Sequence, residues 1–260
     1  MTARSDVTAA KRIVVKVGSS SISGDNVHQL ANIVDAIASA HARDVEVVLV
    51  SSGAIATALP HFGLSARPHN DLVIEQAAAA VGQTMLMVRY QDSLNRFGIV
   101  AAQVLLTSGD MEVESTRLNA KAAIDKLLAL SFLPIVNEND TVATHEIRFG
   151  DNDRLAALVA ELVSADLLVL LSDVDALYSK PPGEPGAEKI EFVSYADDLS
   201  GIEIGSVGEA GVGTGGAETK LAAARHATHA GIPVILTAAA LVGAALSGET
   251  VGTWFDPSPR

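Results

Sequence analysis

Short runs of apolar residues alternate along this chain with longer stretches in which apolar residues recur at helical spacing. The short runs are rich in Val, Ile and Leu and are bounded by Gly, Pro, Ser or Asn, which is typical of buried strands. The longer stretches place apolar residues on one face, which is typical of helices that cover a sheet. The predicted strands are residues 12–17, 45–50, 99–106, 132–136, 167–171 and 233–236, and the predicted helices are 27–40, 71–97, 115–130, 155–162 and 221–230.

The order of these elements predicts the fold class. Strands that alternate with helices, and that read as nearly continuous apolar runs, are typical of parallel sheets with both faces covered. We therefore expect an α/β fold, a three-layer αβα sandwich around a mostly parallel central sheet. No repeat or linker divides the sequence, so residues 1–260 are interpreted as a single domain. Residues 178–216 are rich in glycine and proline and should form loops and short hairpins.

The composition argues against several classes of function. The 260 residues carry 18 basic and 31 acidic side chains, a formal net charge of −13, which argues against a nucleic-acid partner. The chain has no cysteine, which excludes disulfides, thiolate chemistry and zinc–thiolate sites. The N-terminal segment lacks a signal-peptide pattern, and the apolar run 232–246 is too short to cross a bilayer. We therefore expect a cytoplasmic protein without a membrane partner.

Small and polar residues follow four of the predicted strands, at the point where each strand ends. They read "KVGSSS" from residue 16, "SSGA" from 51, "NEND" from 137 and "SDVD" from 172. Each string alone would suit a turn or a helix cap. In open α/β sheets, however, ligands bind outside the carboxyl ends of the strands, and these four ends should meet at one edge. Together they predict a ligand site at that edge.

Two lysines predict an anionic ligand. Lys16 lies inside an apolar strand, where a cation is costly unless an anion meets it. Lys220 lies where a helix begins, and the helix dipole disfavours a cation there unless something anionic is bound. The preceding glycines in "GVGTGGAETK" would let backbone N–H groups approach a phosphate. A Walker A loop is absent, and the match to a dinucleotide fingerprint is weak because no strand precedes it and no acid follows at about twenty residues.

Carboxylates and amides are more numerous in residues 136–154 than helix caps require. Asp151, Asn152 and Asp153 directly precede a predicted helix, and one of the three can be its cap. Asp140 ends the "NEND" string. A free amino acid brings an ammonium group, and a buried ammonium needs carboxylate and amide oxygens as partners. These residues are therefore candidates for binding an amino acid.

Between about residues 12 and 233 the chain carries, in this order, "VVKVGSS", "VSSGAIA", "QAAAAVGQ", "NENDTVATHEIRFGDND", "LLSDVDALY" and "GTGGAETK". With these strings the sequence resembles the amino-acid kinase family and, within it, the glutamate 5-kinases. The most specific string is "NENDTVATHEIRFGDND", because related kinases of acetylglutamate, aspartate or UMP share the fold but not that string. Ala176 and Ala217 stand where the family commonly has Gly and Met. The resemblance implies the amino-acid kinase fold, in a form without the C-terminal PUA domain that many members append.

The resemblance implies that the γ-phosphoryl group of ATP moves to the side-chain carboxylate of L-glutamate, giving L-glutamyl 5-phosphate, the first step of proline biosynthesis. That carboxylate has an ordinary pKa of about 4.3, so it is ionised at neutral pH and no general base is needed. Mg²⁺ would arrive with ATP, bound chiefly to phosphate oxygens. A homo-oligomer, dimer or tetramer, and feedback inhibition by proline are also expected by resemblance.

The resemblance also implies roles for individual residues. Lys16 and Lys220 would be catalytic and offset the negative charge, and Asp153 would organise them through ion pairs. Residues from about 12 to 165 would form the substrate side of the domain, and residues from about 166 to 260 the nucleotide side. The substrate would be held by Ser52, Asp140 and Asn152, and ATP by Lys16, Gly18, Ser172, Asp173, Thr214, Gly215, Gly216, Ala217, Glu218, Thr219 and Lys220.

Two other functions stay open at this stage. One is a sister kinase that phosphorylates another carboxylate or a carbamate. The other is a non-catalytic amino-acid or nucleotide sensor with the same fold, although a sensor need not keep both Lys16 and Lys220 together with Asp153. A screen for ADP release with several acceptors separates the kinases.

Overall fold

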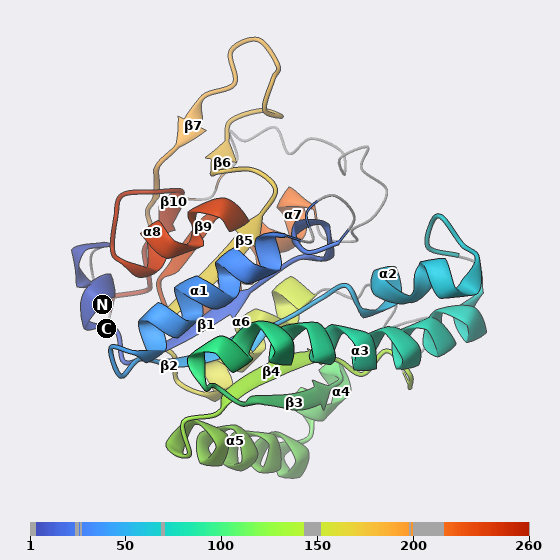
Figure 1. Cartoon of the computed structure of the whole chain (residues 1–260). Coiled ribbons are helices and arrows are strands. Elements are labelled where there is room, and N and C mark those ends of the chain that lie inside the picture. Colours follow the sequence, from blue (N-terminus) through green and yellow to red (C-terminus); the bar gives the residue numbers. More distant parts are fainter. Residues whose placement is uncertain are drawn as a thin grey trace.

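The computed structural model describes residues 4–23, 26, 28–68, 71–142, 152–197, 199 and 216–259. One central sheet contains eight strands in the order β3-β4-β2-β1-β5-β9-β10-β8 (Figure 1). The six strands from β3 to β9 are mutually parallel, whereas β10 is antiparallel to β9 and β8 pairs parallel to β10. In chain order the strands of this sheet are β1 (Arg12–Lys16), β2 (Glu46–Val50), β3 (Ala101–Leu106), β4 (Leu133–Glu138), β5 (Leu167–Ser172), β8 (Phe192–Val193), β9 (Val234–Ala238) and β10 (Thr253–Phe255).

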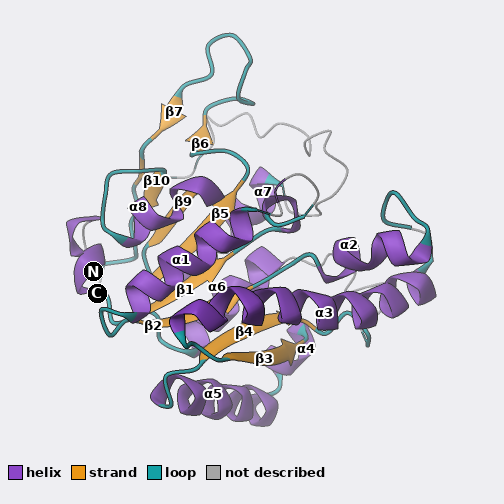
Figure 2. Cartoon of the chain, in the orientation of Figure 1, coloured by secondary structure: helices purple, strands orange, loops and turns teal. Residues whose placement is uncertain are grey.

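Helices cover both faces of this sheet (Figure 2). One apolar core lies between the sheet and α1 (Gln29–His41), α3 (Leu72–Leu94) and α8 (Val242–Leu246). A second core lies between the other face and α5 (Glu114–Ala129), α6 (Asn152–Leu162) and α7 (Ala217–His229). Successive strand residues point to opposite faces, so β1 gives Val15 to the first core and Val14 to the second. The predicted three-layer αβα sandwich with a mostly parallel sheet is confirmed.

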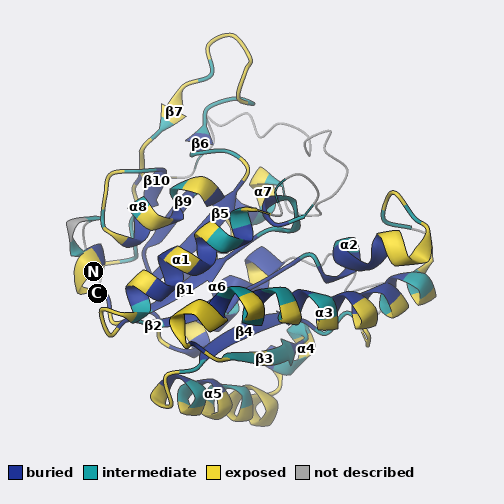
Figure 3. Cartoon of the chain, in the orientation of Figure 1, coloured by how far each residue is buried: buried dark blue, intermediate teal, exposed yellow. Residues whose placement is uncertain are grey.

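Burial follows from this layering (Figure 3). All residues of β4 and β5 are buried, as is each residue of β1 and β2 after the first. A helix has one side on the sheet and one in solvent, and α1 buries the four apolar residues whose spacing predicted it, Leu30, Ile33, Val34 and Ile37. None of the described helices is both long enough and apolar enough to cross a membrane.

Several boundaries differ from those that the pattern predicts. The helix expected at 221–230 already begins at Ala217, and the strand expected at 132–136 continues through Asn137 to Glu138. The long helix ends at Leu94, and a 3-10 turn, Asn95–Phe97, follows. The loop-rich stretch contains the two-stranded hairpin of β6 (Leu177–Tyr178) and β7 (Lys189–Ile190). The pattern also missed α2 (Ala54–Ala58), α4 (Ser108–Glu112), the 3-10 turn Ala239–Leu241 and the three-residue strand β10.

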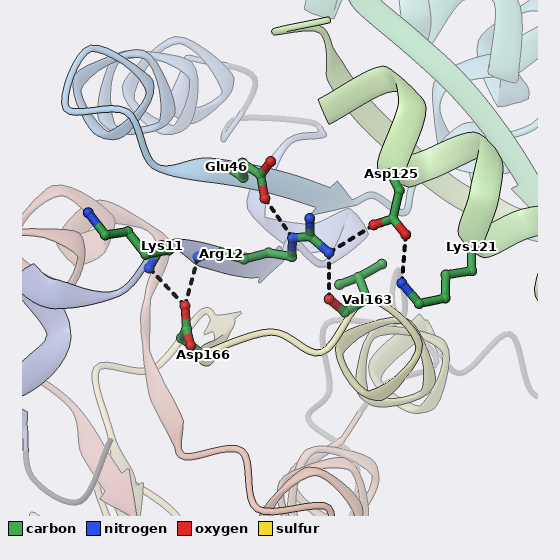
Figure 4. A network of polar contacts seen from close by, with 7 residues as sticks. All are labelled: Lys11, Arg12, Glu46, Lys121, Asp125, Val163 and Asp166. Atoms are coloured by element: carbon green, nitrogen blue, oxygen red, sulfur yellow. Dashed lines mark hydrogen bonds and ion pairs between the residues drawn. The ribbon is translucent and has the colours of Figure 1, made fainter. Parts of the chain in front are cut away.

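A polar network fixes the amino ends of the strands (Figure 4). The Arg12 guanidinium donates hydrogen bonds to the Glu46 carboxylate at 2.7 Å, to Asp125 at 2.9 Å and to the carbonyl oxygen of Val163 at 2.7 Å. The Asp166 carboxylate accepts from the backbone N–H of Arg12 at 2.9 Å. These contacts join β1, β2, α5 and the turn before β5, and they occupy the edge of the sheet opposite the predicted ligand site.

Candidate active site at the carboxyl edge of the sheet

The four polar strand ends singled out in the sequence share one edge of the sheet. β4, β2, β1 and β5 are consecutive neighbours and all run in the same direction. Their carboxyl ends therefore meet, and so do the segments that follow them. Among the described residues, this edge includes the turn after β1 and the first turns of α2, α6 and α7, where backbone N–H groups and small side chains are available to a ligand.

Lys16 is the last residue of β1 and points into the second core. Val14, two residues earlier, packs against the helices of that face, and strand alternation gives Lys16 the same direction. Lys16 is only 4% exposed, and its Nζ lies 2.6 Å from Oδ1 of Asp153, the second residue of α6. The anion that a buried lysine requires is therefore supplied, at least in part, by the protein itself.

Lys220 approaches the same carboxylate from α7. Its Nζ lies 3.1 Å from Oδ2 of Asp153, and the Thr219 hydroxyl donates to that oxygen at 2.9 Å. Gly216 is the extended N-cap of α7, so Lys220 lies in the helix's first turn, as predicted. The sequence argument took the unfavourable dipole at Lys220 as a sign of bound phosphate. In the structure Asp153 provides a negative charge to Lys220, and a phosphate beside this helix start stays a prediction.

The electrostatics of this cluster keep Asp153 ionised. Burial by itself would raise the pKa of Asp153, but the charges of Lys16 and Lys220, together with hydrogen bonds from Lys16 and Thr219, lower it to about 2. One carboxylate is thus shared by two ammonium groups, and the three groups together carry a net positive charge. Such an arrangement can hold and stabilise an additional anion close to both lysines.

Turns after β1 and β2 pack against each other beside this cluster. A Cβ added to Gly18 would lie 3.7 Å from Nζ of Lys16, so the backbone there passes close to the ammonium. Gly53 has a φ of 91°, a left-handed conformation that favours glycine, and a Cβ on it would lie 3.4 Å from Cα of Ser19. Ser52, buried directly before Gly53, is held in this tight turn.

Asp140, on the loop after β4, has an unusual environment. Burial raises the pKa of Asp140 to about 6, while the charge of Arg67 lowers it and that of Glu75 raises it. Arg67 and Glu75 form an ion pair with an Nη2–Oε2 distance of 3.1 Å, and Glu75 is 4% exposed. The loop before α3 thus brings a cation, and the first turn of α3 a buried acid, to the neighbourhood of the half-buried Asp140.

Asn152 opens α6 next to Asp153 and is buried. Its Oδ1 atom has no hydrogen-bond partner among the described residues. A buried carbonyl oxygen without a partner is costly, because it has lost its water and gained no donor. Such an atom is suited to accept a hydrogen bond from a ligand.

Sequence reasoning missed a buried amide pair at the same edge. Asn137 is 1% exposed at the end of β4, and its Nδ2 donates to Oε1 of Gln83 in α3 at 2.7 Å. Ser51 and Tyr90 are also in contact, with 2.9 Å between their hydroxyl oxygens, and burial raises the pKa of Tyr90. A usable signal existed for Gln83, since a glutamine on the buried face of an alanine-rich helix requires a polar partner.

Most, but not all, of the residues predicted to bind ATP lie among the described residues. Ser172 ends β5 and donates to Oδ1 of Asp173 at 3.0 Å, and β5 pairs with β1 in the register Lys16 to Leu170. Gly216, Ala217 and Glu218 form the beginning of α7. Thr214, Gly215 and the candidate cap Asp151 lie outside the described residues. Within the described ranges, no group of three His, Asp or Glu side chains could hold a metal ion.

Comparison with known proteins agrees with this architecture. Residues 11–238 match the model of the family described as the amino acid kinase family. A protein named glutamate 5-kinase from Clavibacter michiganensis subsp. michiganensis is 67% identical over 98% of this chain and 97% of that protein. Another from Streptomyces coelicolor is 55% identical over 99% of this chain and 70% of its own length. Carbamate kinase from Giardia lamblia bound to AMP-PNP has the same fold, with a TM-score of 0.67 and 18% identity, covering 96% of this chain and 100% of that one. The chain belongs to the amino-acid kinase family, in the group of relatives named glutamate 5-kinase.

Proposed function

We propose that this protein is a glutamate 5-kinase, which transfers the γ-phosphoryl group of ATP to the side-chain carboxylate of L-glutamate. The observation that carries the proposal is the buried cluster in which Asp153 holds Lys16 and Lys220 at the carboxyl edge of the sheet. The names of the relatives, at up to 67% identity, supply the substrate. The product would be L-glutamyl 5-phosphate, the first intermediate towards proline.

The reaction needs charge compensation rather than proton transfer. A side-chain carboxylate oxygen of glutamate bonds to the γ-phosphorus, the bond from that phosphorus to the β–γ bridging oxygen breaks, and ADP leaves with those electrons. The nucleophile is ionised at neutral pH because an ordinary glutamate pKa is about 4.3. Two anions must approach each other, so the net positive charge of Lys16, Lys220 and Asp153 is the feature that lowers the barrier. Asp153 keeps both lysines in place.

Glutamate would bind between the ends of β2 and β4 and the beginning of α6. In our proposal its ammonium group donates to the unpartnered Oδ1 of Asn152 and pairs with the carboxylate of Asp140. Ser52, held buried by the turn at Gly53, provides a further polar contact. This arrangement leaves the side-chain carboxylate of glutamate directed to the lysines.

ATP would bind at the end of β5 and the beginning of α7. Ser172, Asp173 and the described residues 216–220 would form that side, and backbone N–H groups at the beginning of α7 suit phosphate oxygens. Residues from about 12 to 165 thus form the substrate side and residues from about 166 to 260 the nucleotide side of one domain. Mg²⁺ would come with ATP and offset the charge of its phosphates, and it would rely mainly on phosphate oxygens because both oxygens of Asp153 already bind lysines.

The direct test traps the product. Acyl phosphates react with hydroxylamine, so hydroxamate formation with ATP, Mg²⁺ and L-glutamate identifies the phosphorylated carboxylate. Acetylglutamate, aspartate, carbamate and UMP are assayed in parallel for ADP release. Glutamate is expected to be the preferred acceptor by kcat/KM. Turnover of another acceptor in preference to glutamate, or ADP release without hydroxamate, contradicts the proposal.

Two further properties are expected from the family resemblance in the sequence and belong to the proposal. Feedback inhibition by proline is tested by adding L-proline to the hydroxamate assay. A homo-oligomer, dimer or tetramer, is tested by light scattering on the purified chain. An assay indifferent to proline or a monomeric mass removes the corresponding property and leaves the proposed chemistry unaffected.

A further inference from the structure

Gln83 is a buried polar residue to which the proposed mechanism assigns no role. It lies on α3 with 8% exposure, and its Oε1 accepts the hydrogen bond from Nδ2 of Asn137 at 2.7 Å. Its other amide atom, Nε2, is also buried and has no hydrogen-bond partner in the described part of the chain. An amide nitrogen that is cut off from water and makes no bond destabilises the fold, and proteins keep few such atoms.

The backbone fixes which way the two amides face. The N–H of Glu138 can only donate, and it donates to Oδ1 of Asn137 at 2.9 Å. Asn137 must therefore present its NH₂ group to Gln83, and Gln83 must present its oxygen to Asn137. The NH₂ group of Gln83 is consequently directed away from Asn137. This chain of contacts identifies the atom without a described partner as Nε2, a donor. The opposite orientation of the Gln83 amide would place two NH₂ groups against each other and break the bond to Asn137.

The place of Gln83 in the fold connects this donor with the proposed substrate site. A Cβ on the preceding residue, Gly82, would lie 1.7 Å from the carbonyl oxygen of Ala54, so α3 touches the turn that follows Ser52. On its other side Gln83 holds Asn137, which leads within three residues to Asp140. Gln83 thus contacts the end of β4 directly, and its neighbour Gly82 contacts the beginning of α2, which follows the end of β2.

We propose that Nε2 of Gln83 donates a hydrogen bond to the α-carboxylate of the bound amino acid. This inference rests on the proposed function. In that proposal the side-chain carboxylate meets the lysines and the ammonium meets Asn152 and Asp140. Ser52 is a polar contact assigned to no particular group, so the α-carboxylate has no charged or amide donor. A neutral amide is suited to this position. It can orient the unreactive α-carboxylate, and because it carries no charge it does not compete with Lys16 and Lys220 for the reactive side-chain carboxylate. Gln83 is then a specificity residue for amino acids that carry an α-carboxylate.

The test compares two substrates that differ in that one group. 4-Aminobutyrate is glutamate without its α-carboxylate. For each compound we would measure kcat/KM, and the dissociation constant by calorimetry, with the wild type and with Gln83→Met. Gln83→Met should lower kcat/KM and affinity for glutamate by about ten-fold or more, as expected when a bond to a charged group is lost. The same values for 4-aminobutyrate should change less than about two-fold. Removing the Gln83 amide would then matter only when the α-carboxylate is present, and this non-additivity is the sign of a direct contact between the two groups. Gln83→Glu, which can still accept from Asn137 but presents an oxygen in place of Nε2, should weaken glutamate at least as strongly.

A matched control lies on the same helix. Gln91 donates to Oδ1 of Asn95 at 2.7 Å and to the carbonyl oxygen of Ile99 at 3.1 Å, so its amide nitrogen is fully partnered within the fold. Gln91→Glu should lower the melting temperature and leave glutamate affinity unchanged. Equal losses for the two substrates in Gln83→Met, or no loss for glutamate, overturn the inference. Wild type that binds glutamate without forming hydroxamate refutes the kinase proposal alone, and wild type that does not bind glutamate refutes both.

Discussion

The Nζ of Lys16 lies 2.6 Å from Oδ1 of Asp153, and the two side chains are only 5% and 1% exposed. Burying an ion pair costs desolvation free energy that the mutual attraction often fails to repay, so such a pair is weak support for stability alone. Here the same carboxylate also binds Lys220 at 3.1 Å, which leaves positive charge in excess. A buried net positive charge is stabilised when an anionic ligand binds beside it. This net charge is the physical reason for interpreting the cluster as a phosphoryl-transfer site.

Replacing Lys16 should affect the chemical step most. Lys16→Met keeps most of the side-chain volume but removes the charge that we propose faces the transferring group. Removing one preorganised electrostatic contact typically lowers kcat by about 100-fold or more. KM for ATP should change far less, because the charge of Lys16 matters most as charge develops in the transition state. Steady-state kinetics with ATP and glutamate varied in turn measure both.

A matched control exists on the surface. Lys189 pairs with Asp175 at 2.9 Å, and its side chain is 36% exposed. Lys189→Met removes an equivalent charge from a solvated pair and should leave kcat and KM near wild-type values. If Lys16→Met raised only KM for ATP, Lys16 would be a ground-state binding residue without a role in catalysis.

Asp153→Asn should destabilise the protein as well as inactivate it. The substitution leaves two buried ammonium groups without their shared anion, and breaking a buried pair costs about 3–5 kcal/mol. The pKa of Asp153 is lowered to about 2, so its ionised form stabilises the fold above the unfolded pKa of about 4. That contribution is lost as the pH falls from about 4 to 2. The difference in melting temperature between wild type and Asp153→Asn should therefore be full at pH 7 and shrink below pH 4. A difference that did not change with pH would show that Asp153 acts by packing.

Asp140 should behave in the opposite way, because its pKa is raised to about 6. The folded state holds the proton more tightly than the unfolded state, so ionised Asp140 lowers stability as the pH rises from about 4 to 6. Asp140→Asn should therefore raise the melting temperature of the ligand-free protein at pH 7.5. It should also raise KM for glutamate about ten-fold or more, because the pair with the ammonium is lost, while KM for ATP stays nearly constant.

The pH dependence of the wild type checks the same group. Glutamate binding through Asp140 requires the carboxylate form, so KM for glutamate should rise as the pH falls below about 6. The profile of Asp140→Asn should be flat in this range. A destabilised Asp140→Asn with a normal KM for glutamate would make Asp140 a turn residue and place the ammonium elsewhere.

The sequence predicted those parts of the site that depend on the residues of a single short segment. Lys16 stood out because it interrupts a run of β-branched residues, and Asp153 because it begins a helix with more acids than capping requires. Parallel neighbours carry their carboxyl ends to one edge, so the shared location of the polar strings followed from the fold class. These inferences needed no knowledge of which side chains meet.

The parts that sequence could not supply depend on tertiary packing. Gln83 contacts Asn137 across 54 positions of sequence, and nothing in the helical pattern of α3 fixes which turn faces β4. The carboxylate shared by Lys16 and Lys220 could not be told from a bound phosphate, since either anion satisfies a buried lysine. The strand β10 was missed because three residues, Thr253–Phe255, are too few to show a period.

Gly82 offers a test of how tightly the substrate turn is held. A Cβ at this position would lie 1.7 Å from the carbonyl oxygen of Ala54 and 2.6 Å from its carbon, so α2 and α3 cannot keep their separation in Gly82→Ala. Overpacking of this kind costs about 1–3 kcal/mol. In a chain of this size that corresponds to a fall in melting temperature of several degrees, at about 2–4 °C per kcal/mol. Because Ala54 directly follows the Ser52–Gly53 turn, KM for glutamate should rise as well, with KM for ATP affected less.

The control for this variant is Gly243→Ala. Gly243 lies within α8, and a Cβ added there meets nothing within 4 Å. Alanine is favoured over glycine inside a helix by about 0.5–1 kcal/mol, so Gly243→Ala should melt at the wild-type temperature or slightly above it with unchanged kinetics. The two variants add the same methyl group to two helices and differ in what it contacts. If Gly82→Ala were as stable and active as Gly243→Ala, α2 could move away from α3 at no cost. The turn that carries Ser52 would then be free to adjust, and the rigid placement of Gln83 beside it would lose its support.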